Sequence, residues 1–236
     1  NRTSFSKGDW MDLKCYVEEE LNVDFMSSPF SLEAVKLLEE IGVSEYKVPS
    51  GEVTNIPLLE ALARTNKPVL LSSGMSTWNE LDLAVDTLSK GGKLTVLQCV
   101  SEYPCPPEKA GLNVLHEIKR RYNTAVGYSD HSLGSAIPVS AVVLGASVIE
   151  KHFTLSKQMY GSDAFNALEP DEFKFMVNQI REVDLALNSI IDKDKEAASL
   201  SIMKETFEKS IVASRDLKKG EIIELEMLSF KKPGTG

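Results

Sequence analysis

Ala125-Val-Gly-Tyr-Ser-Asp-His131 and Ser147-Val-Ile-Glu-Lys-His152 are two apolar runs that each end in a histidine. An apolar stretch with a helical pattern separates them, and neighbouring parallel strands need a helical crossover of this kind. The two runs therefore predict adjacent parallel strands that carry both imidazoles at the same end. Imidazoles placed there can share a divalent metal. The alternative is a pair of hydrogen-bonded histidines near a core, and His116, in a polar helical stretch, is expected to be solvated.

The same strand and helix rhythm continues outward on both sides of these runs, with one βα unit in every 22 to 30 residues or so, which favours a parallel sheet or barrel. Strands are predicted near Val23–Ser27, Tyr46–Val48, Val69–Ser72, Thr95–Val100, Ala125–Tyr128 and Ser147–His152. Helices are predicted near Trp10–Glu20, Leu32–Ile41, Ile56–Arg64, Asn79–Ser89, Leu112–Arg121, Ser135–Leu144 and Asp171–Asn188.

These six βα units are fewer than the eight of a closed (β/α)8 barrel. We therefore expect an α/β fold, either a (β/α)8 TIM barrel that lacks an N-terminal pair of units or an open doubly wound sheet. We expect the barrel to span residues 1–189, followed by a polar linker over 190–204. From residue 205 a small β-rich module is expected, with a strand from Ser210, a Lys218-Lys-Gly220 turn and another strand directly after it.

The formal net charge of −9 argues against nonspecific binding to nucleic acid or to anionic membranes. The three cysteines lack metal-type spacing, and they fit reduced thiols in a cytoplasmic protein. We find neither a signal peptide nor an apolar run that could span a bilayer.

Polar side chains gather where the predicted strands end, which is where βα folds build their sites. Serine hydroxyls and backbone amides there can cradle a phosphate, and Lys47 would add a compact positive charge. The hydroxyl candidates are Ser27, Ser28, Ser50, Ser72, Ser73, Ser101 and Ser129. Further candidates for substrate contact or proton transfer are Glu52, Tyr103 and Asp163. Taken singly, each serine could instead cap a helix or turn, and Lys47 could lie on the surface.

Six motifs occur in one collinear order along almost the whole chain. They are Lys47-Val-Pro-Ser-Gly-Glu52, Ser72-Ser-Gly-Met75, Ser101-Glu-Tyr-Pro104, Gly127-Tyr-Ser-Asp-His131, Val148-Ile-Glu-Lys-His-Phe-Thr154 and Leu168-Glu-Pro-Asp-Glu-Phe173. This set resembles the sialic acid synthase family, which includes the legionaminate and pseudaminate synthases. The segment Lys209-Ser-Ile-Val-Ala-Ser-Arg-Asp-Leu-Lys-Lys-Gly-Glu221 is similar to the start of that family's antifreeze-like (SAF) domain.

The resemblance implies a barrel enzyme that condenses phosphoenolpyruvate with an N-acetylated amino-sugar aldehyde, either N-acetylmannosamine or a 6-deoxy diacetamido-hexose. It implies a divalent metal, typically Mn²⁺ with Mg²⁺ or Co²⁺ as alternatives, held by His131 and His152 and acting as a Lewis acid on the aldehyde. Lys47, Ser28, Ser50, Ser72, Ser101 and Ser129 match phosphoenolpyruvate-binding positions. Glu52, Tyr103 and Asp163 match positions that face the sugar, and Glu52, Asp163 and Lys47 are the candidate catalytic residues.

The sequence departs from the family pattern in two respects. No counterpart of the family's first two βα units is found, so the Lys and Glu that they supply are missing. Lys232 stands where the family has an arginine that reaches the sugar of a partner subunit in a domain-swapped homodimer. The alternative functions are another phosphoenolpyruvate-using or aldol-type barrel enzyme, or a noncatalytic sugar-binding protein.

Overall fold

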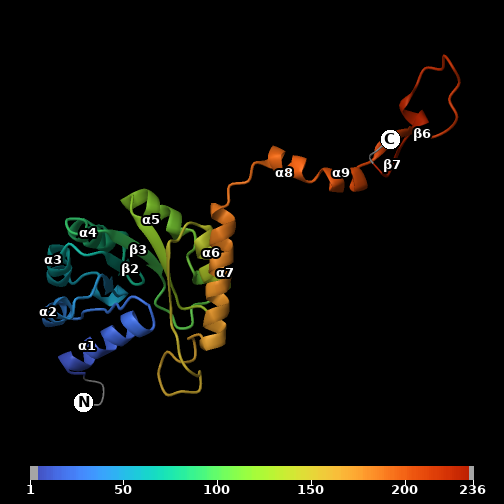
Figure 1. The fold of residues 1–236 in the computed structure, drawn as a ribbon. Helices are drawn as coiled ribbons and strands as arrows, with labels where there is room; N and C mark the ends of the chain where they lie inside the picture. The colour runs from blue at the N-terminus through green and yellow to red at the C-terminus, as the bar shows by residue number, and fades with distance from the viewer. Residues whose placement is uncertain (1–4, 234–236) are drawn as a thin grey trace. The chain divides into compact units, whose positions relative to one another are not determined.

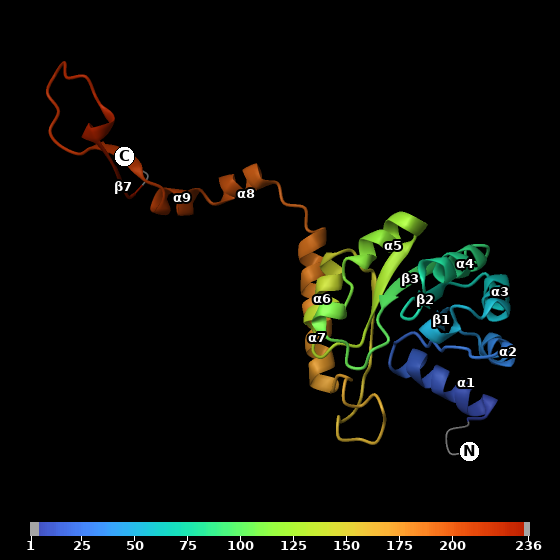
Figure 2. The same ribbon diagram turned by 180° about the vertical axis from the view of Figure 1, so that it is seen from behind.

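The computed structural model describes residues 5–233. The chain divides into two compact units, residues 1–187 and 188–236, and each is described here by itself (Figures 1 and 2). Within the described residues no helix is long and apolar enough to span a membrane.

The first unit is a curved parallel sheet with its helices on the outer side (Figure 1). The strands are β1 (Tyr46–Val48), β2 (Val69–Ser72), β3 (Leu94–Cys99), β4 (Ala125–Asp130) and β5 (Val148–Lys151), paired in chain order. Sequential order without a switch point is the topology of a barrel and not of a doubly wound sheet. The predicted incomplete TIM barrel is therefore confirmed, with β1 and β5 as the two edge strands of five.

Helices precede, connect and follow these strands, and all but the first, which starts at Lys7 and ends at Cys15, lie near their predicted positions. They are α1 (Lys7–Cys15), α2 (Leu32–Ile41), α3 (Ile56–Thr65), α4 (Trp78–Leu88), α5 (Val114–Tyr122), α6 (Ala136–Val143) and α7 (Pro170–Asn188). Local sequence sets their ends. Ser31 accepts a hydrogen bond from the Ala34 amide at the start of α2, and Thr77 with Glu80 forms a capping box on α4.

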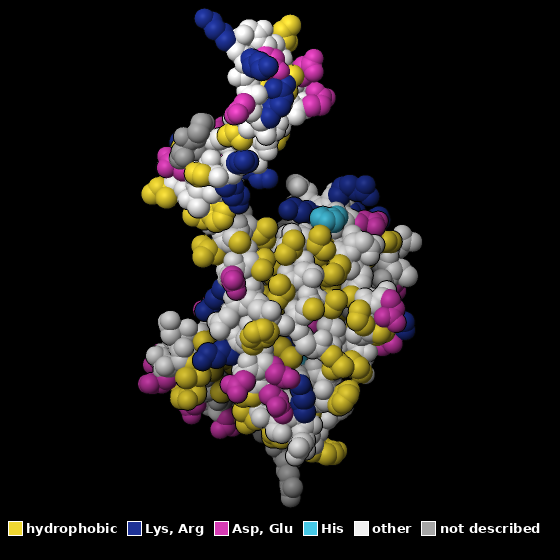
Figure 3. Space-filling view, turned by 90° about the vertical axis from the view of Figure 1, so that its right-hand side faces the viewer, with side chains coloured by type: hydrophobic (Ala, Val, Ile, Leu, Met, Phe, Trp, Pro, Cys, Tyr) yellow, Lys and Arg dark blue, Asp and Glu magenta, His cyan; other side chains and the backbone are white. Residues whose placement is uncertain are grey.

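The core lies between the sheet and these helices, because β2 is buried along its whole length and α3 and α4 turn apolar sides towards it. Leu59 and Leu62 of α3 are fully buried, as is Leu71 of β2. Figure 3 shows further apolar side chains gathered on the face that carries α7, where Phe175 and Leu185 are 60% and 70% exposed.

The predicted first strand is wrong except at its last residue, where Ser27 forms an isolated parallel bridge with Tyr46. The preceding residues bond to the chain before them instead. The Val23 amide donates to the Val17 carbonyl, and the Phe25 amide donates to the Glu18 carboxylate at 3.4 Å. The helix predicted near Trp10–Glu20 ends in a π-helical turn, Tyr16–Glu20, shortly before this segment.

The second unit contains two short helices, α8 (Lys193–Ser199) and α9 (Ser201–Phe207), in and just beyond the stretch predicted as a linker. Strand β6 (Ser210–Ala213) pairs antiparallel with β7 (Leu228–Lys231). The second strand was predicted directly after Gly220, and this is wrong. Glu221 at that place bonds to Arg215 and to the Lys218 amide, so the segment forms a loop.

Candidate active site

His131 and His152 lie side by side at the carboxyl ends of β4 and β5. Their ring centroids are 5.2 Å apart, and the rings meet edge to face. Tyr103, in the loop after β3, covers both, with its ring centroid 4.0 Å from that of His131 and 5.7 Å from that of His152. The parallel register of β4 and β5 produces this closeness, because it pairs Asp130 with Lys151 and so places the next residues together.

An oxygen atom lies near Nδ1 of each imidazole, and at His131 it accepts a hydrogen bond. His131 Nδ1 lies 2.7 Å from the Val100 carbonyl oxygen. A carbonyl can only accept, so Nδ1 donates, and in the neutral imidazole the lone pair is then on Nε2. His152 Nδ1 lies 3.5 Å from Asp163 Oδ2. Each histidine therefore has an orienting oxygen at Nδ1, which is the arrangement usual for metal-bound histidines.

The environment separates the pKa values of the two imidazoles. Burial lowers the pKa of His131, but the hydrogen bonds to Cys99 and to the Val100 carbonyl outweigh it, so the pKa lies above its usual value. Burial and the neighbouring His131 lower the pKa of His152 below its usual value. The neutral form, which is the one that binds metals, is therefore favoured most at His152.

The imidazole pair fits a divalent cation with few protein ligands. Among residues 5–233 no group of three or more His, Cys, Asp or Glu side chains is arranged to hold a metal ion. The two imidazoles can offer two nitrogen ligands, one fewer than the three protein ligands usual in catalytic zinc sites.

Lys47 lies on the same inner side of the sheet, 9% exposed. Its Nζ lies 3.2 Å from Glu150 Oε2, so this ion pair joins the two edge strands β1 and β5 across the inside of the curved sheet. Both residues line a cavity of about 640 Å³ together with Ser28. A positive charge and a hydroxyl in one cavity can bind an anionic group of a substrate.

Of the remaining serines, Ser50 and Ser101 lie against the chain at Gly74. Ser50 Oγ accepts a hydrogen bond from the Gly74 amide at 2.9 Å. A Cβ on Gly74 would lie within 3 Å of Ser101 Oγ, Ser50 Oγ and Cys99 Sγ, so only glycine allows this close approach. Ser72 is 2% exposed, and its Oγ has no hydrogen-bond partner among the described residues. Ser129 is buried opposite Cys99 in the β3–β4 register.

The other two candidates differ in their surroundings. Asp163 lines a cavity of about 250 Å³ together with His152 and Tyr160, so the structure brings it to the histidine pair. Glu52 Oε2 accepts a hydrogen bond from Asn55 Nδ2 at 2.7 Å, and Asn55 caps α3. The structure thus pairs Glu52 with a residue at a helix start.

Sequence reasoning assigns no site role to Cys99 and Glu150, although both contact predicted site residues. Cys99 Sγ lies 3.9 Å from His131 Nδ1 and 3.7 Å from Ser50 Oγ. The sequence signal for Cys99 is the strand period of two, because alternate residues of β3 face the same side of the sheet. Glu150 is the polar residue two positions before His152, but its pairing with Lys47 depends on the curvature of the sheet.

The NeuB family model matches residues 1–192, and the SAF domain model matches residues 208–236. The chain is 41% identical over 235 residues to N,N'-diacetyllegionaminic acid synthase of Campylobacter jejuni, covering 96% of this chain and 70% of that protein. It is 34% identical over 219 residues to pseudaminic acid synthase of Helicobacter pylori, covering 92% of this chain and 64% of that protein.

A solved structure agrees with these sequence matches. The N-acetylneuraminic acid (sialic acid) synthetase of Leptospira borgpetersenii, crystallised with citrate, superposes with a TM-score of 0.77 at 32% identity. The match covers 84% of this chain and 70% of that one, so about a third of the length of these relatives has no counterpart here. This chain therefore belongs to the NeuB family, with a SAF domain after its barrel region.

Proposed function

We propose that the protein condenses phosphoenolpyruvate with an N-acetylated amino-sugar aldehyde to give a nonulosonic acid and inorganic phosphate. The observation that carries this proposal is the juxtaposition, on one edge of the sheet, of an anion-binding side and an imidazole pair. In support, Lys47 shares a cavity with Ser28, and His131 and His152 lie side by side at the carboxyl ends of β4 and β5. The names of the relatives, legionaminic, pseudaminic and sialic acid synthases, agree with this chemistry.

The residues of the anion side would hold phosphoenolpyruvate. The Lys47 ammonium would pair with its phosphate or carboxylate, and the hydroxyls of Ser28, Ser50, Ser72, Ser101 and Ser129 would donate hydrogen bonds to it. The orphan Ser72 Oγ supports this role, because a buried hydroxyl without a partner costs free energy that a substrate oxygen would recover. Held there, the enol carbon can be aimed at an aldehyde in the neighbouring part of the site.

His131 and His152 would hold a divalent cation through Nε2, and that cation, when bound, supplies Lewis-acid polarisation of the aldehyde oxygen. Tyr103, which packs on both rings, would shield the imidazoles from bulk water. Asp163 would bind a sugar hydroxyl and exchange a proton at Oδ2. Overall a carbon–carbon bond forms between the enol carbon and the aldehyde carbon, water adds at the neighbouring carbon, and the bond to phosphate breaks.

The test measures phosphate release from phosphoenolpyruvate by the full-length protein with a panel of N-acetylated hexosamines, with and without Mn²⁺. We expect release that depends on both the sugar and the metal. Phosphate release with none of the sugars in the presence of Mn²⁺ would reject the proposal. Sugar binding that a chelator leaves unchanged would instead favour the noncatalytic alternative.

Two serines offer a matched pair of variants, because each has a buried Oγ without a partner in the described part of the chain. Ser72 is at the carboxyl end of β2, and Ser76 lies in the loop that follows. Ser72→Ala should raise the KM for phosphoenolpyruvate several-fold, whereas Ser76→Ala should leave it unchanged. An equal KM in both variants would remove Ser72 from the anion site.

We also propose a cytoplasmic homodimer in which the SAF region of each chain reaches the site of its partner. Lys232, at the position of the family arginine, places its Nζ 4.8 Å from the Phe207 ring centroid, a cation–π contact within the second unit. A role at the partner's site would require Lys232 to leave that contact. A monomeric mass of the full-length protein in solution would contradict the dimer.

A further inference from the structure

Asp130 and Lys151 form an ion pair directly before the two histidines. The register of β4 and β5 places them opposite each other, and Lys151 Nζ lies 2.5 Å from Asp130 Oδ2. The Asp130 side chain is 0% exposed, and the Lys151 side chain is 1% exposed. Taking two charges out of water is costly, and a buried pair of this kind is often no more stabilising than apolar residues of similar volume. Global stability is therefore a weak explanation for it.

The same groups close the turn that contains His131. Asp130 Oδ1 accepts a hydrogen bond from the Ser132 amide at 3.1 Å, and Asp130 Oδ2 accepts one from Ser132 Oγ at 3.0 Å. Lys151 Nζ also donates to the Ser132 carbonyl. The ammonium thus bonds to the residue on each side of His131, while its own backbone continues directly into His152. One side chain therefore couples the two backbones that carry the imidazoles.

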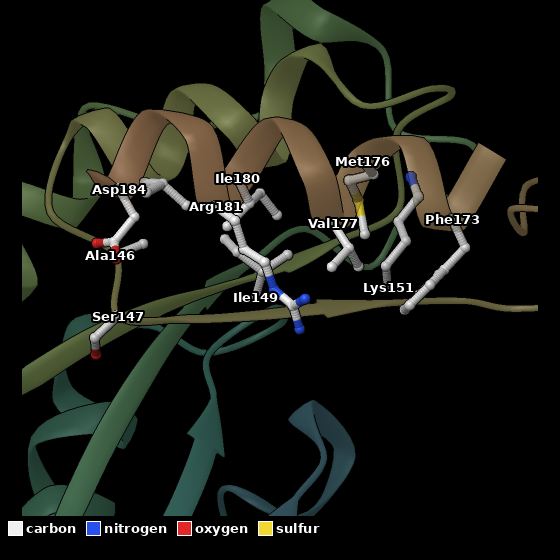
Figure 4. A pocket seen from close by; sticks show the side chains of 11 residues that line it. Ala146, Ser147, Ile149, Lys151, Phe173, Met176, Val177, Ile180, Arg181 and Asp184 are labelled. Atoms are coloured by element: carbon white, nitrogen blue, oxygen red, sulfur yellow. The ribbon is translucent and has the colours of Figure 1, made fainter. Parts of the chain in front are cut away.

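Lys151 reaches this position through apolar surroundings. Figure 4 shows it between β5 and α7, next to Met176 and Phe173. These residues line a cavity of about 450 Å³ on the helix side of the sheet. Lys151 also borders the cavity of about 640 Å³ that Lys47, Ser28 and Glu150 line. Attraction between the charges is strong in such a setting, which makes the contact a stiff one.

We propose that Asp130 and Lys151 are positioning residues that fix the separation of His131 and His152 and thereby set the affinity of the site for a divalent cation. The inference rests on the metal role of the histidines in the proposed function. The pair acts through the backbone of both strand ends, as second-layer residues commonly do at metal sites. Removing the Asp130–Lys151 pair should weaken cation binding more than a substitution elsewhere that lowers the unfolding free energy by the same amount.

The experiment measures the Kd of Mn²⁺ by calorimetry or electron paramagnetic resonance on the full chain, together with denaturant unfolding. The double variant Asp130→Asn with Lys151→Met removes both charges and leaves no unpaired one, so it should fold. We expect its Mn²⁺ affinity to fall tenfold or more. Leu59→Ala, in the buried core of α3, is the control for general destabilisation and should keep the wild-type Kd.

Asp130→Glu provides a second variant that keeps both charges. The extra methylene should disturb the turn around His131, and we expect a several-fold weaker Mn²⁺ affinity. A wild-type Kd in Asp130→Glu, or in the folded double variant, would overturn this inference but not the proposed function. Mn²⁺ binding absent from the wild-type protein would overturn the metal role in the proposed function together with the inference.

Discussion

Gly127, in the middle of β4, offers a stringent test of how the sheet supports the site. Replacement by alanine would place a Cβ 2.2 Å from Leu97 Cδ2 on β3 and 2.7 Å from the Val148 carbonyl oxygen on β5. The leucine methyl can rotate away, but the carbonyl belongs to the backbone of the neighbouring strand. Ordinary contact begins at 3.4 Å, so β4 and β5 must separate by about 0.7 Å.

Two measurable effects follow from this separation. Overpacking of this kind costs about 1–3 kcal/mol of unfolding free energy. Because His131 follows β4 and His152 follows β5, the site also opens, and misplacement by about 1 Å costs on the order of a hundredfold in rate. Gly127→Ala should therefore lower both the denaturant midpoint and metal-dependent phosphate release, the latter by roughly tenfold or more.

Circular dichroism in a denaturant series and the phosphate-release assay measure the two effects. Gly8→Ala is the matched control, because a Cβ there lies 3.6 Å from Ser6 Oγ, an ordinary contact on an exposed helix. It should leave activity unchanged and slightly raise stability, since alanine is the better helix former. A Gly127→Ala protein with the wild-type midpoint and the wild-type rate would refute the reasoning.

Three further predictions concern the core, the metal and pH. Leu59→Ala should cost about 2–5 kcal/mol of unfolding free energy, because the side chain is fully buried, and denaturant unfolding measures the loss. Mn²⁺ at 100 times its Kd should stabilise the wild-type fold by about 2.7 kcal/mol, which a thermal-shift assay detects as a higher melting temperature. A chelator should reverse this rise in melting temperature. The variants His131→Ala and His152→Ala should show no rise with Mn²⁺. The Arg121 guanidinium holds the pKa of Asp82 below its usual range, so this carboxylate stabilises the fold above its unfolded pKa, and the contribution is lost as the pH falls through the lowered folded pKa. Asp82→Asn should therefore flatten the acid limb of the stability curve slightly, and an unchanged limb would contradict the assignment.

Much of the fold follows from local sequence signals. The capping box at Thr77 and the cap at Ser31 define helix starts to within one residue, and the period of the apolar runs identifies all five strands of the sheet. The prediction fails where local polar groups compete with the sheet. Residues from Val23 to Phe25 have strand-like composition, but Glu18 and Val17 take up their amides, and one bridge at Ser27 is all that remains.

The sequence predicts the parts of the candidate site that lie at the carboxyl ends of the strands, where βα folds build their sites. Parallel register alone places His131 beside His152, and the structure adds the 5.2 Å separation. The pairing of Lys47 with Glu150 could not be predicted, because it joins strands at opposite ends of the sheet and depends on curvature accumulated over five strands. The hydrogen bond of His131 to a backbone carbonyl also carries no sequence signal, since any residue at position 100 would supply it.

The position of β5 at the sheet edge has a consequence for the behaviour of the protein on heating. β4 has ladder partners on both sides, whereas β5 has one only on the β4 side among the strands that the structure describes. Segments with fewer such bonds loosen at lower temperature than the fold as a whole. As the temperature rises, the end of β5 would thus depend on the Asp130–Lys151 contact to keep His152 aligned with His131. A contact that stabilises the unpaired side of β5 would keep the site ordered at a higher temperature without changing the core.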